Sequence, residues 1–168
     1  MRALVVGGGC RGLELARALV AEGHAVRAVT RRPEARPAIE AAGAECFIGD
    51  PDVIGTLRYA ADNVTILLWL LGTATGPADK VAALHGSRLR MMLEKTTDTT
   101  VRGVVYEAAG TVGSELLAAG AEEARRAQAL NEIPYALVTA DPADRAAWLA
   151  DARGAIDMLL TARRRAAV

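Results

Sequence analysis

Aromatic residues and cysteines are both scarce in this chain of 168 residues. Aromatics account for only 4% of the sequence, so the core must be mainly aliphatic and drawn from an apolar fraction of 52%. The two cysteines, Cys10 and Cys46, are too few for a disulfide framework, and neither lies in a spacing typical of metal ligands. We therefore expect neither a disulfide-stapled domain nor a metal centre.

The chain also lacks an excess of charge of one sign, and it has no long apolar run. Twenty basic and twenty acidic residues cancel, which leaves no overall field to attract a nucleic acid or an anionic membrane. The most continuous apolar run, residues 64–71, is far shorter than the ~20 residues of a membrane helix. The apolar run before Gly7 is too short for a signal peptide. We expect a soluble cytoplasmic protein, with a solvated helix end at the arginine run 163–165.

Short apolar runs alternate along the sequence with longer stretches of helical periodicity. Several runs are almost continuous Val, Ile and Leu, which is typical of strands buried on both faces. The predicted strands are residues 3–6, 25–30, 45–48, 64–71, 102–107 and 135–139. Strand and helix alternate six times, so we predict one doubly wound α/β domain over residues 1–168. Its six-stranded parallel sheet has helices on both faces and the order 3-2-1-4-5-6.

Three prolines predict where helices begin. Each follows a capping residue, in the pairs Asp50-Pro51, Gly76-Pro77 and Asp141-Pro142. Asp144 adds a carboxylate in the first turn of the last helix, where the helix dipole favours it. One long helix is expected after the fourth strand, and it contains both lysines of the chain, Lys80 and Lys95.

A glycine pattern stands between the first predicted strand and the first helix, with Gly7, Gly9 and Gly12 in the spacing G-x-G-x-x-G. Gly7 permits a tight turn, Gly9 lets the backbone approach a pyrophosphate, and Gly12 lets the helix pack closely on the strand. The N–H groups at the start of the helix favour phosphates. This context predicts a Rossmann-type dinucleotide site; the alternative is a tight turn without a ligand. Cys10 is a small residue tolerated in the loop, or, as the weaker alternative, a redox residue.

The end of the second predicted strand indicates which dinucleotide is bound. An acid at this point would accept hydrogen bonds from the adenosine ribose and favour NAD. Here Thr30, Arg31 and Arg32 occupy the end of the strand, and the first acid is Glu34. A guanidinium pairs well with phosphate, so we predict NADP(H), with Arg11 reaching the same phosphate from the glycine loop. The alternative is that Arg31 and Arg32 are ordinary exposed charges.

With the segments VVGGGCRG, GHAVRAVTRRPE and AGAECFIGDPD, the chain resembles the NmrA-like and other atypical members of the short-chain dehydrogenase/reductase superfamily. The diagnostic residues cover about the first 50 positions. The resemblance implies that Asp50 lies beside the adenine and that Leu71, Gly72 and Thr73 lie beside a ribose of the cofactor. Asp50 precedes a proline and is therefore also an obvious helix cap.

The chain departs from that superfamily in its catalytic residues. The usual pair is a tyrosine with a lysine four residues later, which lowers the pKa of the phenol for proton exchange. Four residues beyond Tyr59, Tyr106 and Tyr135 stand Asn63, Gly110 and Thr139. No such pair is therefore present. We also expect the substrate-binding extension of the superfamily to be missing, since the sequence continues for only one helix past the sixth strand.

Tyr106 and Glu107, at the end of the fifth predicted strand, are the best candidates for proton transfer, because ligands of such sheets lie beyond the carboxyl ends of the strands. The alternative is that Tyr106 fills core or interface space and Glu107 faces solvent. The preferred function is an NADP(H)-dependent oxidoreductase of atypical type that acts on an unidentified small substrate. The competing function is a non-catalytic NADP(H) sensor or regulatory protein. A homodimer would cover the pocket, although no residue pattern requires one.

Overall fold

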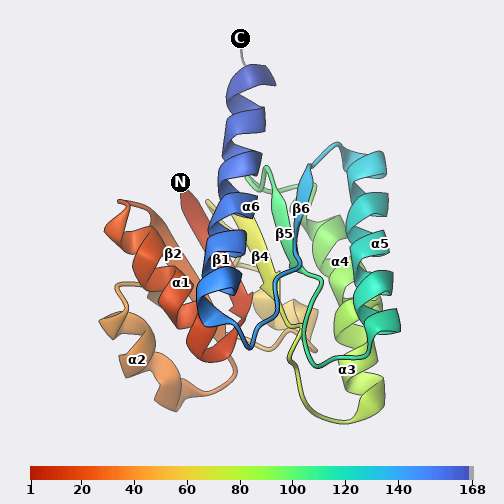
Figure 1. Ribbon diagram of the computed structural model, residues 1–168, viewed down its shortest axis with the longest axis horizontal. Helices are drawn as coiled ribbons and strands as arrows, with labels where there is room; N and C mark the ends of the chain where they lie inside the picture. Colours follow the sequence, from red (N-terminus) through yellow and green to blue (C-terminus); the bar gives the residue numbers. More distant parts are fainter. Residues whose placement is uncertain (167–168) are drawn as a thin grey trace.

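The computed structural model describes residues 1–166, and the predicted arginine run at 163–165 has its side chains outside the described residues. Six strands form one parallel sheet in the order β3-β2-β1-β4-β5-β6, as the sequence predicts (Figure 1). The strands are β1 (Arg2–Gly7), β2 (Ala25–Thr30), β3 (Glu45–Ile48), β4 (Ile66–Leu70), β5 (Val104–Glu107) and β6 (Tyr135–Val138). The predicted fold class and strand order are confirmed.

Helices cover both faces of the sheet. The α-helices are α1 (Gly9–Ala21), α2 (Arg36–Ala41), α3 (Ala78–His85), α4 (Ser87–Thr96), α5 (Ser114–Asn131) and α6 (Arg145–Ala166), and short 3-10 turns lie at Pro33–Ala35 and Ile54–Leu57. Helices α1, α2 and α6 pack on one face, and α3, α4 and α5 lie on the other (Figure 1). Within residues 1–166, none of the helices combines the length with the apolar composition that crossing a membrane requires.

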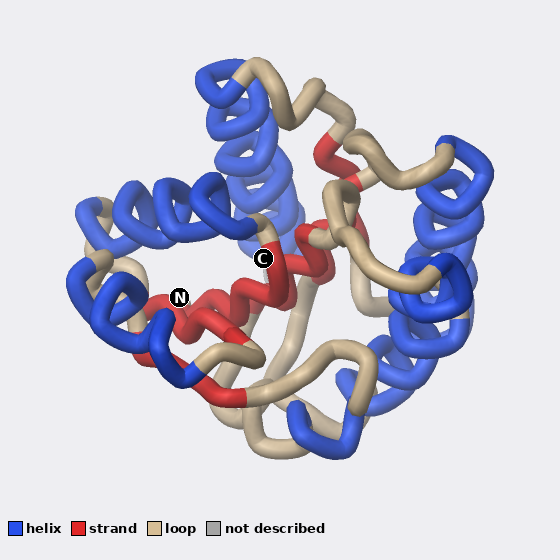
Figure 2. Tube along the Cα trace, turned by 90° about the horizontal axis from the view of Figure 1, so that it is seen from below, coloured by secondary structure: helices blue, strands red, loops and turns tan. Residues whose placement is uncertain are grey.

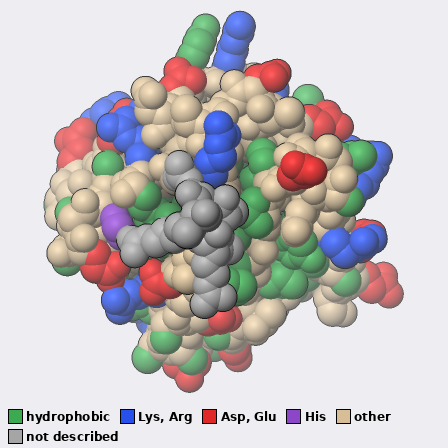
Figure 3. Space-filling model, turned by 90° about the horizontal axis from the view of Figure 1, so that it is seen from above, with side chains coloured by type: hydrophobic (Ala, Val, Ile, Leu, Met, Phe, Trp, Pro, Cys, Tyr) green, Lys and Arg blue, Asp and Glu red, His purple; other side chains and the backbone are tan. Residues whose placement is uncertain are grey.

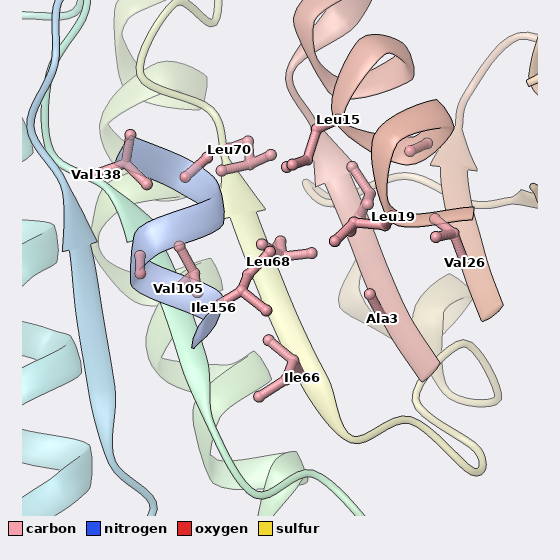
Figure 4. Close-up of a cluster of buried hydrophobic side chains, with 14 of the residues drawn as sticks. Ala3, Leu15, Leu19, Val26, Ile66, Leu68, Leu70, Val105, Val138 and Ile156 are labelled. Carbon is pink, nitrogen blue, oxygen red and sulfur yellow. The ribbon is translucent and has the colours of Figure 1, made fainter. Parts of the chain in front are cut away.

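The core consists of two hydrophobic layers separated by the sheet. Alternate residues of β4 point to opposite sides, with Leu68 and Leu70 in one layer and Leu67 and Trp69 in the other. Figure 4 shows the first layer, where side chains of α1 and α6 meet the strands. Since β4 is buried on both faces, its sequence is a continuous apolar run rather than an alternating one.

The helix predicted after the fourth strand is divided in two. Helix α3 ends at His85 and α4 begins at Ser87, because Gly86 between them has φ −128° and ψ −102°, outside the helical region. Three strands are also shorter than predicted. β4 is Ile66–Leu70 rather than 64–71, β5 begins at Val104 rather than at residue 102, and β6 ends at Val138 rather than at residue 139.

Of the three predicted helix starts, only that at Pro77 lies at a helix: α3 begins at Ala78, with Pro77 as its N-cap rather than its first helical residue. The other two prolines do not start helices. Pro51 opens a turn, in which the Asp50 carboxylate accepts the N–H of Asp52 at 2.9 Å. After Asp141, helix α6 begins only at Arg145. Asp144 Oδ1 accepts the N–H of Ala147 at 3.0 Å, so the carboxylate predicted for the first turn is itself the cap. The side chain of Asp141 instead accepts the N–H of Ala143, in the turn that precedes the helix.

Charges of both signs are interspersed on the molecule. Figure 3 shows Lys and Arg side chains next to Asp and Glu over the face seen there. Ion pairs such as Arg145–Glu14 and Arg153–Glu22 join α6 to α1 at the surface. This arrangement agrees with the balanced composition of the sequence.

Candidate functional site

A groove of about 1130 Å³ lies at the carboxyl ends of β1, β2 and β4. Figure 2 looks from below at the loops that follow the strands. The strand order reverses between β1 and β4, and ligands of open α/β sheets bind at such a point. Five segments of the chain line the groove: the glycine turn, the end of β2, residues 34–39, residues 49–52, and the loop from Leu70 into α3.

The glycine turn has the backbone geometry that a close approach requires. Gly7 has φ +87°, and a Cβ atom there would collide with the carbonyl oxygen of Leu70. A Cβ atom on Gly12 would lie 2.6 Å from the carbonyl oxygen of Gly7, so α1 can pack on β1 only with glycine at this position. Gly9, at φ +52°, has no atom within 4 Å of the place where its Cβ atom would stand. The backbone at Gly9 is therefore open to a ligand.

Helix α1 points its amino end at the groove. Gly8 precedes the helix in a left-handed conformation, with no side chain capping the first turn. Its N–H donates to the carbonyl oxygen of Leu70 at 2.6 Å, which ties the turn to β4. The first N–H groups of a helix have no partner within it, and together with the dipole they favour an anion. Gly9, Cys10 and Gly12 all line the groove beside this helix end.

The turn after β2 presents the two predicted arginines to the groove. The N–H of Arg32 donates to Thr30 Oγ1 at 3.1 Å, which fixes the chain direction after the strand. Thr30, Arg31 and Arg32 all line the groove, and both arginines are exposed. Within the described part of the chain, neither guanidinium takes part in an ion pair. Glu34 lines the groove as well, one turn further on.

Two acids and a lysine form another wall of the groove. Asp50 lines it, and its N–H donates to Thr56 Oγ1 at 2.8 Å. Asp52 binds Lys80 at 2.8 Å and Arg88 at 3.2 Å. The hydrogen bond from Lys80 lowers the pKa of the Asp52 carboxyl, so that acid stays ionised. The sequence analysis missed Asp52 and Lys80, because nothing in their spacing shows that α3 packs beside the turn after β3.

The arginine of the glycine loop turns away from the groove. Arg11 Nη2 lies 3.0 Å from Glu107 Oε1 and 3.2 Å from Thr73 Oγ1. Its guanidinium carbon lies 5.1 Å from the centre of the Trp148 ring. Arg11 therefore does not line the groove, where it was predicted to reach a phosphate. Gly72 is buried and does not line the groove, whereas Leu71 and Thr73 on either side of it do.

Tyr106 and Glu107, the predicted proton-transfer residues, are fully buried and do not line the groove. The Tyr106 hydroxyl lies 2.7 Å from His85 Nδ1 and packs against Gly120. Burial, reinforced by the nearby charge of Glu107, raises the pKa of Tyr106 well above its usual range. For Tyr106 the sequence left open the alternative that the side chain fills core space, and this buried environment agrees with it. Glu107 does not face solvent, so the alternative given for it is wrong.

His85 and Trp148 belong to this buried polar region, and the sequence analysis did not single out either as a site residue. His85 is 1% exposed and Trp148 is 1% exposed. Trp148 Nε1 donates to Glu107 Oε1 at 2.7 Å. Trp148 lies on α6, far from Glu107 in the sequence, so the partner of its indole N–H could not be deduced without the fold. Across residues 1–166, no group of three or more His, Cys, Asp or Glu side chains is arranged to hold a metal ion.

Comparison with known proteins supports the same site. Residues 2–48, which comprise β1, α1, β2 and β3, match the family described as pyridine nucleotide-disulphide oxidoreductase. No curated protein matches the chain. The match lies on the βαβ unit that carries the glycine turn and the two arginines, and it supports pyridine-nucleotide binding there.

Solved structures share the fold. Triphenylmethane reductase from Citrobacter sp., crystallised with NADP(H), superposes with a TM-score of 0.65 at 18% identity over 83% of this chain and 49% of its own. UDP-glucose 4-epimerase from Thermotoga maritima superposes with a TM-score of 0.69 at 12% identity, over 83% of this chain and 55% of its own. Vestitone reductase from alfalfa superposes with a TM-score of 0.60 at 15% identity, over 82% of this chain and 56% of its own.

These neighbours are reductases and epimerases, and a UDP-glucuronic acid 4-epimerase from Bacillus cereus among them was crystallised with NAD. The Rossmann-type fold that the resemblance implies is confirmed. The chain spans about half the length of the structures that it matches.

Proposed function

We propose that this chain binds NADP(H) in the groove and that Arg31 and Arg32 recognise the phosphate on the adenosine ribose. The observation that carries the proposal is the end of β2, where two exposed arginines without ion-pair partners among the described residues line the groove. The first acid after the strand is Glu34, so the carboxylate that would favour an unphosphorylated ribose is absent from the strand end.

The remaining groove residues suit the other parts of the dinucleotide. The pyrophosphate would lie against Gly9 and the amino end of α1, where the backbone is open and positively polarised. Asp50 would lie beside the adenine, and Leu71 and Thr73 beside a ribose, as the family resemblance implies. When bound, the coenzyme supplies hydride chemistry; the residues named here supply its binding and orientation.

Arg31→Ala tests the phosphate assignment. We expect the dissociation constant for NADPH to rise by about one to two decades and that for NADH to change much less, since only NADPH carries the phosphate. Arg36→Ala is the matched control, because Arg36 is an exposed arginine on α2 that does not line the groove. Equal weakening of both coenzymes in Arg31→Ala, or the same loss in Arg36→Ala, contradicts the assignment.

The use of the bound coenzyme is a separate proposal. An oxidoreductase acting on an unidentified small substrate needs a proton donor that the substrate can reach. The hydroxyl of Tyr106 and the carboxylate of Glu107 are both buried behind the groove wall. This burial favours the second candidate function, a non-catalytic NADP(H)-binding protein whose occupancy is the signal.

Turnover distinguishes the two functions. NADPH consumption is measured against a panel of carbonyl and quinone compounds, with Tyr106→Phe and Glu107→Ala alongside. The non-catalytic candidate predicts tight binding with no turnover above background. Turnover that disappears in Tyr106→Phe would instead establish the oxidoreductase and give Tyr106 its predicted role.

A further inference from the structure

Glu107, a buried carboxylate that does not line the groove, lies at the carboxyl end of β5. The Glu107 side chain is 0% exposed, and both of its oxygens are engaged. Oε1 accepts from Arg11 Nη2 at 3.0 Å and from Trp148 Nε1 at 2.7 Å. Oε2 accepts the backbone N–H of Gly72 at 2.7 Å. One side chain thus joins β5 to α1, to α6 and to the loop after β4.

A carboxylate taken out of water is unfavourable unless it is paired and hydrogen-bonded. Glu107 meets this condition only while Arg11 and Gly72 stay where they are. An apolar pair of similar volume would fill the same space without the desolvation penalty. Stability alone therefore does not account for an ion pair at this position, and fixing a geometry is a role that such pairs have in other proteins.

The partners of Glu107 belong to two segments of the groove wall, which follow the adjacent strands β1 and β4. Arg11 lies between Cys10 and Gly12, which line the groove at the amino end of α1. Gly72 lies between Leu71 and Thr73, which line it on the β4 side. Arg11 strengthens the connection by a second hydrogen bond, from Nη2 to Thr73 Oγ1 at 3.2 Å. The carboxylate therefore holds the two segments together from behind.

We propose that Glu107 is a positioning residue of the coenzyme groove: through Arg11 and Gly72 it sets the spacing between the glycine turn and the 71–73 loop. This inference rests on the proposed function, since the relative position of the two segments affects binding only if a dinucleotide occupies the groove. It assigns Glu107 no contact with the coenzyme and no proton transfer. It also gives Arg11 a role other than phosphate recognition.

Glu107→Gln tests the role, because glutamine keeps the shape of the side chain and removes its charge. The dissociation constants for NADPH and NADH are measured by calorimetry. We expect both to rise by about tenfold, so that the preference between the two coenzymes is unchanged. Arg31→Ala, in contrast, changes that preference. Binding of both coenzymes by Glu107→Gln within about twofold of the wild type would overturn the inference.

Trp148→Phe separates positioning from general stability. It removes one hydrogen bond to the same oxygen, but the lost donor belongs to α6, which does not line the groove. Urea unfolding should show a destabilised fold, while the affinity for NADPH stays within about twofold of the wild type. An affinity loss in Trp148→Phe equal to that of Glu107→Gln would mean that the network is only structural.

A double variant covers the case in which Glu107→Gln does not fold. Arg11→Met with Glu107→Leu removes both charges and approximately preserves the volume, so we expect it to fold. It should bind both coenzymes about tenfold more weakly than the wild type, because the N–H of Gly72 has lost its acceptor. If this variant binds both coenzymes as tightly as the wild type, the inference about Glu107 fails while the proposed function stands. If the wild type itself binds neither coenzyme, the proposed function fails as well.

Discussion

His85 shows how much a single residue can depend on its tertiary surroundings. In the sequence it lies within the one long helix predicted after the fourth strand, and no local pattern indicates that its imidazole is buried. In the structure its Nδ1 atom pairs with the Tyr106 hydroxyl, and its Nε2 atom is buried without a hydrogen-bond partner among the described residues. Desolvation lowers the pKa of the His85 imidazole below 6.5, against a smaller opposing effect of the Leu71 carbonyl.

The pKa of His85 predicts a pH dependence of stability. Because the folded state holds the imidazole neutral, the unfolded state binds more protons once the pH falls below about 6.5. The free energy of unfolding should therefore decrease as the pH is lowered from 7 towards 5, by at most ~1.4 kcal/mol per pH unit from this one group.

Urea unfolding of the wild type and of His85→Gln across this range checks the prediction. The difference in the free energy of unfolding between the two proteins should vary with pH over this range. A constant difference between wild type and His85→Gln from pH 7 to pH 5 would rule out the assigned cause.

At the scale of the elements, the sequence was informative wherever local periodicity decides the structure. β2 and β3 have the predicted bounds, because their apolar runs end at turn residues. The division of the helix after β4 was missed, since Gly86 alone does not reveal its backbone conformation. The start of α6 was misplaced because Asp141 and Asp144 are both good caps, and only the packing of the loop selects the second.

Two glycines inside helices should respond oppositely to alanine. Gly154 of α6 is exposed, and a Cβ atom there would have no neighbour within 4 Å. Gly154→Ala should therefore stabilise the protein by roughly 0.5–1 kcal/mol through helix propensity. Gly120 of α5 packs on the Tyr106 hydroxyl, where a Cβ atom would collide. Gly120→Ala should destabilise the protein by about 1–3 kcal/mol.

Urea unfolding of both variants measures these changes, and each serves as the control for the other. A stabilised Gly120→Ala would show that Tyr106 can move at little cost. That result would also weaken the conclusion that its hydroxyl is fixed beside His85.

At the scale of the whole molecule, strand order and groove position were predictable, whereas the buried network was not. A parallel sheet with a glycine turn after its first strand places a ligand site where the order reverses. The environment of Glu107, however, depends on Arg11 and Trp148, which are far from it in the sequence and converge only when α1 and α6 pack on the same face. No local sequence pattern predicts that Arg11 and Trp148 contact the same carboxylate.

The central claim is that the groove binds NADP(H) and distinguishes it from NAD(H) by the charge at Arg31 and Arg32. Calorimetric titration of the wild-type chain with NADPH and with NADH tests it most directly. We predict saturable heat with NADPH and an affinity at least about tenfold higher than for NADH, as an additional charge-assisted phosphate contact should give. No heat with either coenzyme, or tighter binding of NADH, would contradict the claim.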